Sequence, residues 1–438
     1  MAATQNRDMG SGSIPKLLAQ LALPAVVAQV VNLLYNIVDR IYIGHMPEVG
    51  ASALTGVGLF TPILMLITAF AMLCGSGGAP RAAIAMGRGD DDAAEKIMGN
   101  CFTLLLILAA VLTVVFYFAA PSLLVLFGAS EKTLPYALDY ARIYIIGTIF
   151  VLIVMGMNPF VTTQGFATFS MMTTVIGAVC NIILDPILIF ALNMGVRGAA
   201  TATVISQAVG VKNMPLVGKV IGPCLGLGVS TFVMIATESI LSISFNSSLA
   251  RYGGDIAVGA MTIITSATQL LSMPVQGLCQ GAQPIMSFNF GAGKGDRVKQ
   301  AFRLQFIICV AYAAAFWAAC MLVPQMFASI FSTDPELVRY TAWAMRVYMA
   351  GIFSTGFQVS CQQSFVALGQ AKISLFMACL RKLILLIPLI FILPLILQDK
   401  VFAVFLAEPV SDIIAATVTC SAFFIRFNKI LATSQKKA

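Results

Sequence analysis

Apolar segments long enough to cross a bilayer follow one another along the chain, and this feature restricts the fold more than any other. A bilayer core needs about 20 consecutive helical residues, and such runs, with their flanks, occur at 17–38, 102–120, 306–323 and 383–397. Charged residues make up only 10% of the 438 residues, whereas a soluble domain carries about a quarter. Too little polar sequence remains to cover a soluble globule, so we predict an all-α membrane protein.

The apolar segments predict about twelve transmembrane helices. Their approximate ranges are 16–41, 51–78, 97–120, 134–157, 162–192, 195–211, 218–247, 255–287, 299–323, 336–360, 370–397 and 400–427. An even number of crossings places both termini on one side of the membrane. Most Lys and Arg residues of the loops and tail share that side, while the opposite loops hold mainly Lys132, Arg251 and Lys400. The positive-inside rule therefore predicts a multi-pass protein of the cell inner (plasma) membrane with both termini in the cytoplasm.

The second half of the chain repeats the first at a constant offset of 204 residues. Matching positions are turn, loop and interfacial residues, and they include Gly77 and Gly281, Pro80 and Pro284, Tyr144 and Tyr348, Gly147 and Gly351, and Gly165 and Gly369. Each half has an even number of spans, so the two repeats run parallel. We predict an N-terminal six-helix bundle at 14–210, a short cytoplasmic linker at 211–217 and a C-terminal six-helix bundle at 218–427. A working cavity is expected between the bundles, near the membrane midplane.

Polar residues of the first and fifth predicted spans form a candidate cation site. A stripe at helical spacing on the first span consists of Gln29, Asn32, Asn36 and Asp39. Asn181 and Asp185 lie one turn apart on the fifth span, directly before Pro186. A charge in a bilayer core costs at least ~2.5 kcal/mol on insertion scales, so buried acids need a function or a partner. Oxygen ligands suit Na⁺, and a carboxylate in a low dielectric also binds H⁺; a hydrogen-bond network that only joins the helices is the alternative.

Amides and hydroxyls line three predicted spans of the second half. They are Glu238, Ser242 and Asn246 on the seventh span, Gln269, Ser272, Gln276, Gln280 and Gln283 on the eighth, and Ser354, Gln358 and Gln362 on the tenth. Neutral amides hydrate a cavity without a strong charge, which suits varied and often cationic substrates; helix packing through hydrogen bonds is the alternative. The residues that we expect to line a substrate cavity are Glu238, Gln276, Gln280, Gln283, Gln358, Met72 and Asn158. The 22 methionines can form a pliable wall for such ligands or serve plain packing.

Two further acids, Glu408 and Asp412, lie one turn apart on the twelfth predicted span. Arg381 or Lys382 on the preceding span can neutralise them. A structural ion pair between Arg381 and these acids, or a substrate site, are the two interpretations.

The sequence lacks the sets of residues that enzymatic chemistry needs. His45 is the single histidine, so a histidine-based metal site or triad is excluded. We expect no enzyme activity, no cofactor and no bound metal, except possible Na⁺ at Asp39 and Asp185. Energy must then come from a gradient of H⁺ or Na⁺. The net charge of +8 lies in loops and termini, so the expected partners are small amphipathic or cationic substrates and the lipid bilayer, not nucleic acid. We expect a monomer.

Several motifs occur at characteristic places in the chain. They are Asn36-Ile-Val-Asp39, Pro80 with Gly87-Arg-Gly89, Gln164-Gly165, Asn181-Ile-Ile-Leu-Asp185-Pro186 and Gln280-Gly281-Ala-Gln-Pro284. Over residues 14–427 the chain resembles the multidrug and toxic compound extrusion (MATE) transporters, bacterial drug-exporting branch. The resemblance implies two bundles of six helices and export of amphipathic compounds by antiport against H⁺ or Na⁺. It also implies that Asp39, Asn181, Asp185 and Thr203 form a cation cluster, and that Glu238 matches an acid on the seventh helix.

The sequence departs from this family pattern at two places. The tenth span carries no acid, although some sodium-coupled relatives have an Asp there. The sixth span is about 20 residues shorter than its repeat counterpart, and residues 195–211 cover roughly 25 Å at about 1.5 Å per residue. A flippase for a lipid-linked precursor is the alternative transporter, but such cavities tend to carry several arginines. A non-transporting membrane receptor or scaffold is the alternative of another class.

Overall fold

The computed structural model describes residues 9–44, 46, 50–127, 129–208, 221–331 and 335–435. Within these ranges the secondary structure is helical, with turns between the helices and no strand. Nine of the described helices are long and apolar enough to cross a membrane, or ten if one bent pair counts as a single span. The predicted all-α class is therefore confirmed. The side chain of Asn36, His45 and the predicted linker 211–217 lie outside the described residues.

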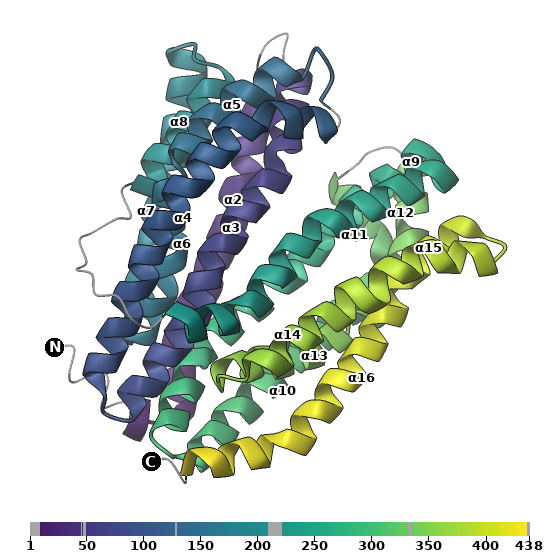
Figure 1. Cartoon of the computed structure of the whole chain (residues 1–438). Coiled ribbons are helices and arrows are strands. Elements are labelled where there is room, and N and C mark those ends of the chain that lie inside the picture. Colours follow the sequence, from purple (N-terminus) through teal and green to yellow (C-terminus); the bar gives the residue numbers. More distant parts are fainter. Residues whose placement is uncertain are drawn as a thin grey trace.

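The N-terminal half forms one group of helices (Figure 1). Its elements are α2 (Ile14–Gly44), α3 (Gly50–Gly87), α4 (Asp91–Leu126), α5 (Leu134–Ile146), α6 (Thr148–Thr163), α7 (Ala167–Pro186), the π-helix η1 (Ile187–Ala191) and α8 (Val196–Ala208). Helices α5 and α6 meet at Gly147 with a bend of 58° and together form the fourth predicted span. Helix α8 has 13 residues in its described part, or about 20 Å at 1.5 Å per residue.

The C-terminal half forms the second group (Figure 1). Its elements are α9 (Ile221–Gly291), α10 (Gly295–Leu322), α11 (Pro324–Phe331), α12 (Pro335–Tyr348), the 3₁₀ turn η2 (Met349–Gly351), α13 (Ser354–Ala367), α14 (Ala371–Cys379), the π-helix η3 (Leu380–Leu386), α15 (Ile387–Ile396) and α16 (Lys400–Gln435). Helix α9 contains the seventh and eighth predicted spans, which are separated by a break at Gly254 with φ of 64°. The 3₁₀ turn η2 interrupts the tenth span and ends at Gly351, the repeat counterpart of Gly147.

Each half packs around a hydrophobic core of its own. The first core joins α3 to α8 and includes Phe60, whose ring centroid lies 5.6 Å from Tyr140 and 5.4 Å from Tyr144. The second core joins α9 to α16 and includes Phe302 and Phe423, with ring centroids 4.5 Å apart. Two separate cores agree with two bundles, while the exact limits 14–210 and 218–427 remain a prediction.

The two bundles contact each other most closely at the end where both termini lie (Figure 1). Here the first half of α2 packs against the C-terminal bundle, and its residues Ile14, Leu17 and Leu18 belong to the second hydrophobic core. Glycines permit the close approach, because a Cβ on Gly281 would overlap the Ala22 backbone and a Cβ on Gly291 would overlap the Ile84 carbonyl. Small residues at a helix interface let backbones touch. The contacts at this end therefore hold the two bundles together.

Candidate functional site

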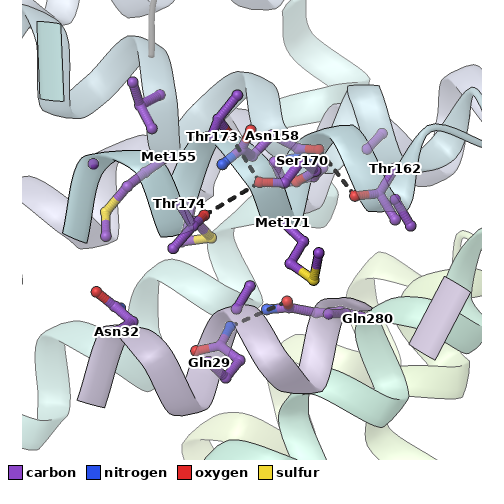
Figure 2. A pocket seen from close by; sticks show the side chains of 18 of the residues that line it. Gln29, Asn32, Met155, Asn158, Thr162, Ser170, Met171, Thr173, Thr174 and Gln280 are labelled. Carbon is purple, nitrogen blue, oxygen red and sulfur yellow. Dashed lines mark hydrogen bonds between the residues drawn. The ribbon is translucent and has the colours of Figure 1, made fainter. Parts of the chain in front are cut away.

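A cavity of about 170 Å³ lies where α2, α6 and α7 of the first bundle face the second half of α9. Figure 2 shows Gln29 and Gln280 on one side of this space, opposite Met171 and Thr174 of α7. The amide of Gln29 donates to the Gln280 side-chain oxygen at 3.2 Å and so connects the two bundles across the cavity wall. The described lining has no charged side chain. Such a wall can hold an amphipathic molecule through apolar contacts and a few hydrogen bonds.

Only some of the residues expected to line a substrate cavity do so in the structure. Gln280, Gln283, Met72 and Asn158 line the cavity. Gln276, Glu238 and Gln358 are not among the described residues that line it. Gln276 is exposed one turn before Gln280. Gln358 is buried at 3% exposure inside the second bundle.

Two carboxylates meet inside the N-terminal bundle. Asp39 of α2 and Asp185 of α7 are 8% and 0% exposed, and the Asp185 carboxyl interacts with Asp39 by charge and by a side-chain hydrogen bond. The amide of Asn181 donates to Asp185 Oδ1 and to Thr203 Oγ1, both at 3.3 Å. The four residues named for a cation cluster thus lie together, and the remaining candidate, Asn36, has no described side chain.

The described residues do not satisfy every acceptor atom of this cluster. The second Asp185 oxygen, Oδ2, and the Asn181 Oδ1 are buried without a hydrogen-bond partner among the described residues. Asp185 forms no salt bridge with a described Lys or Arg. Two carboxyls in contact repel each other when both are ionised, so a shared proton or a cation stabilises them. Oxygen atoms of this kind suit H⁺ or a hard cation such as Na⁺.

Three tyrosines complete the surroundings of the acid pair, and the sequence analysis did not single them out. Tyr140 and Tyr144 of α5 are buried and both interact electrostatically with Asp39 and with Tyr35. Tyr140 also forms a side-chain hydrogen bond with Thr203. Tyr35 had a visible signal, because it lies one helical turn before Asp39 on the polar stripe. Tyr140 had none, since it comes near the acids only because α5 packs against α8, which carries Thr203.

The C-terminal bundle holds a cluster of opposite charges. Arg381 Nη2 lies 3.0 Å from Glu408 Oε1, and Arg381 Nε lies 2.7 Å from Asp412 Oδ1. The Ser411 hydroxyl donates to the Arg381 carbonyl at 3.0 Å. The three charged side chains are mostly buried, at 20%, 11% and 4% exposure. Arg381 thus forms ion pairs with both acids, which favours the first of the two interpretations, a structural ion pair.

Lys382 lies next to Arg381 in sequence but has another partner. Its ammonium group forms a salt bridge with Glu238 and donates to the Met234 carbonyl at 2.7 Å. The sequence left Arg381 and Lys382 as alternative partners for Glu408 and Asp412, and the structure selects Arg381. Both bases stand on η3, whose i+5 hydrogen bond runs from the Ile387 N–H to the Lys382 carbonyl. Such π-helical turns are often found at functional sites.

The polar side chains of α13 form hydrogen bonds within their own bundle. Gln305 of α10 donates to the Ser360 hydroxyl at 3.1 Å, and Gln362 donates to the Met234 sulfur at 3.1 Å. These contacts favour the packing interpretation for this part of the polar stripe.

A twelve-segment helical protein with two bundles, a neutral cavity between them and acids buried inside a bundle has the features of a secondary membrane transporter. The sequence model of the MatE family matches residues 24–187 and 230–392, and the chain therefore belongs to this family. The resemblance to MATE transporters and the twelve-helix, two-bundle fold are confirmed. Members of this family are membrane transporters that need no cofactor, which also confirms that the chain is not an enzyme.

Known relatives cover nearly the whole chain. The multidrug export protein MepA of Staphylococcus haemolyticus (strain JCSC1435) is 24% identical over 429 residues, which cover 93% of this chain and 94% of the relative. The structure of the MATE multidrug transporter DinF-BH, solved in complex with a ligand, has a TM-score of 0.86 and 32% identity, and covers 95% of this chain and 96% of that chain. A MATE structure in the bent conformation has a TM-score of 0.89 at 24% identity and covers 98% and 99%.

Proposed function

We propose that this protein exports small amphipathic compounds, mostly cations, in exchange for H⁺ or Na⁺. One observation carries the proposal: a single stripe on α2 connects the cavity to the acid pair. Gln29, Asn32 and Tyr35 line the cavity, and Asp39 follows one turn later in contact with Asp185. A change of charge at Asp39 can therefore alter the cavity wall through one helix.

The coupling follows from repulsion between buried carboxylates. When neither proton nor Na⁺ is bound, ionised Asp39 and Asp185 repel each other in a poorly hydrated bundle. Binding of the coupling cation relieves this repulsion and favours a different packing of α2 against α7. A cationic substrate in the cavity is attracted by the same negative field. It leaves when the coupling cation enters, which is antiport.

The relatives support the substrate class. MepA carries the name multidrug export protein, and DinF-BH is a multidrug transporter that has been solved with a ligand bound. The cavity of this chain has the methionines Met72, Met155 and Met171 in its lining, and flexible thioether side chains adapt to ligands of different shape. The described part of the lining contains no arginine of the kind that a lipid pyrophosphate needs, so the flippase alternative has less support.

Orientation follows from the positive-inside rule. We place both termini in the cytoplasm of a bacterial cell, so the glycine contacts close the cytoplasmic side. The described arrangement then corresponds to an outward-facing state. The protein works as a monomer, since each chain contains both bundles.

Ethidium efflux from proteoliposomes tests the proposal. The vesicles contain the purified full chain with its extracellular side facing outward. They receive an inwardly directed H⁺ gradient, an inwardly directed Na⁺ gradient or no gradient. We expect efflux with one gradient and its loss when that gradient is collapsed by an ionophore. Equal ethidium movement in protein-free vesicles, or movement that ignores both gradients, would reject antiport.

A further inference from the structure

In the C-terminal bundle a buried lysine forms an ion pair with an exposed glutamate. Lys382 has a side chain that is 5% exposed, and its ammonium group bonds both to Glu238 and to the Met234 carbonyl. Both acceptors belong to the first part of α9. The Glu238 side chain is 52% exposed. One end of this ion pair is therefore buried in the bundle, and the other end is open.

The exposed end belongs to a helix segment beside the region between the bundles. Phe232, on the same part of α9, packs its ring 4.8 Å from Phe70 of α3, so this part of α9 borders the N-terminal bundle (Figure 1). Ser242 and Asn246 follow Glu238 at one-turn intervals and are also exposed. A stripe of polar side chains would be costly against lipid hydrocarbon. It is stable beside a hydrated space.

The charges of the cluster do not balance. Glu238, Glu408 and Asp412 stand against Arg381 and Lys382, so three carboxylates and two cations leave one net negative charge when all are ionised. Arg381 is held by two acids that are 11% and 4% exposed. A cation from outside the bundle therefore meets its first carboxylate at Glu238, where Lys382 is already bound.

We infer that Lys382 is a tethered competitor that occupies Glu238 when no cationic substrate is bound and weakens the binding of organic cations there. This inference rests on the proposed export of cations. Arrival of a substrate ammonium or aromatic cation at Glu238 releases the Lys382 ammonium, which keeps its bond to the Met234 carbonyl. Return of Lys382 expels the substrate. The lysine thus lowers affinity and speeds release, and it acts on cations but not on neutral compounds.

The first test is equilibrium binding of ethidium to the full chain in lipid nanodiscs, measured by fluorescence anisotropy. Lys382→Met removes the charge and keeps the length of the side chain, and we expect a Kd about tenfold lower, within the ~5–150-fold range of common coupling between ligands. Lys382→Arg keeps the cation and should stay within about twofold of the unchanged protein. Lys372→Met changes an exposed lysine on α14, the helix that directly precedes η3, and this matched control should not change the Kd.

Addition of Glu238→Gln shows whether the gain acts through this carboxylate. The Lys382→Met/Glu238→Gln variant should lose the tenfold gain, and it avoids an unpaired carboxylate if the single variant folds poorly. Binding of a neutral dye such as Nile red should be equal in all variants. Unchanged or weaker ethidium binding by folded Lys382→Met, or a gain that persists without Glu238, would overturn the inference.

A second measurement does not depend on drug export. Lys382→Ala leaves space beside Glu238, and added butylammonium should raise the melting temperature of this variant by on the order of 2 °C. Lys382→Ala/Glu238→Gln and Lys372→Ala should show no such rise. If neither the unchanged protein nor any variant binds ethidium, export of this cation is rejected. The shift in melting temperature with butylammonium still decides the role of Lys382. No rise in Lys382→Ala would reject the tethered competitor.

Discussion

In the N-terminal bundle the Asp185 carboxyl has the Asn181 amide and another acid, Asp39, as its partners, whereas in the C-terminal bundle the Asp412 carboxyl accepts a hydrogen bond from the Arg381 guanidinium. The surroundings are related by the internal repeat. Tyr144 lies near Asp39 in the first bundle, and its counterpart Tyr348 lies near Glu408 and Asp412 in the second.

The difference teaches how one framework can serve two purposes. No described Lys or Arg forms a salt bridge with Asp185, and such a carboxylate can take its positive charge from solution and release it again. A site that contains its own guanidinium is already neutralised, and the guanidinium cannot leave. We therefore assign cation coupling to the first bundle and a permanent ion network, with Glu238 at its open edge, to the second.

The largest effect is expected from loss of charge in the first bundle. Asp185→Asn keeps the shape and hydrogen bonding of the side chain but removes the titratable charge, and Asp39→Asn does the same on α2. We predict that either change reduces gradient-driven ethidium efflux to the background of protein-free vesicles, although the protein still inserts and purifies normally.

Asp139→Asn is the matched control for these variants. Asp139 forms an exposed salt bridge with Arg197 at 2.9 Å, and water and salt screen such surface pairs so that they contribute little to stability. Its efflux should equal that of the unchanged protein. Undiminished efflux by Asp185→Asn and by Asp39→Asn would move the coupling charge elsewhere, with Glu238 as the next candidate.

The second bundle should respond in stability instead. Arg381→Met leaves Glu408 and Asp412 buried without their base, and removal of one partner from a buried ion pair costs about 3–5 kcal/mol. Thermal unfolding should show a large drop in melting temperature. By contrast, Asp185→Asn should change stability by less than about 1 kcal/mol, because it keeps the hydrogen bonding and removes the repulsion between the two acids.

A neutralised cluster provides the control for this prediction. Arg381→Met combined with Glu408→Gln and Asp412→Asn should recover most of the lost stability, since no buried charge remains unpaired. If Arg381→Met alone unfolds at the temperature of the unchanged protein, the guanidinium is not the resident cation of this bundle.

A third prediction concerns the glycine contact that holds the two bundles together at one end. Gly281→Ala places a methyl group against the backbone of Ala22, and overpacking of this kind costs about 1–3 kcal/mol. The contacts at the end that carries the termini should weaken. Accessibility of single cysteines introduced on that side, measured with a membrane-impermeant maleimide, should increase.

Gly58→Ala is the control, and it tests whether any glycine-to-alanine change in a spanning helix increases the accessibility of the introduced cysteines. Gly58 lies in α3 and has no atom within 4 Å of an added Cβ, so alanine should leave accessibility unchanged and stabilise the helix by about 0.5–1 kcal/mol. Equal accessibility in both variants would show that the glycine contact does not hold this end closed.

The smallest effect is expected at the cavity wall. Gln280→Leu removes the bond to Gln29, and a single neutral hydrogen bond contributes about 0.5–1.5 kcal/mol. We predict a rise in KM for ethidium of about two- to tenfold with little change in maximal rate, measured in the same vesicles. Gln276→Leu changes an exposed residue outside the described lining and should give a smaller shift. An equal shift in both variants would argue that the cavity extends to Gln276.

The fold was largely readable from the chain, because span length, loop charge and the 204-residue repeat are local or periodic properties. The polar stripe on α2 was readable for the same reason, since helical spacing alone puts Asn32 and Asp39 on one face. The sequence did not show which basic residue pairs with which acid in the C-terminal bundle. Arg381 and Lys382 are neighbours in sequence, and both were possible partners for the acids on the next span.

Sequence alone thus determined that acids lie inside membrane-spanning helices and on which helix face each one stands. Tertiary structure decided which positive group meets which acid. Lys382 and Glu238 are 144 residues apart, and they meet because η3 packs against the first part of α9 while α16 brings Glu408 to Arg381. Tyr140 reaches the Asp39 site in the same way, through helix packing. Contacts between distant segments depend on how whole helices are placed, and helical spacing within one segment carries no information about that placement.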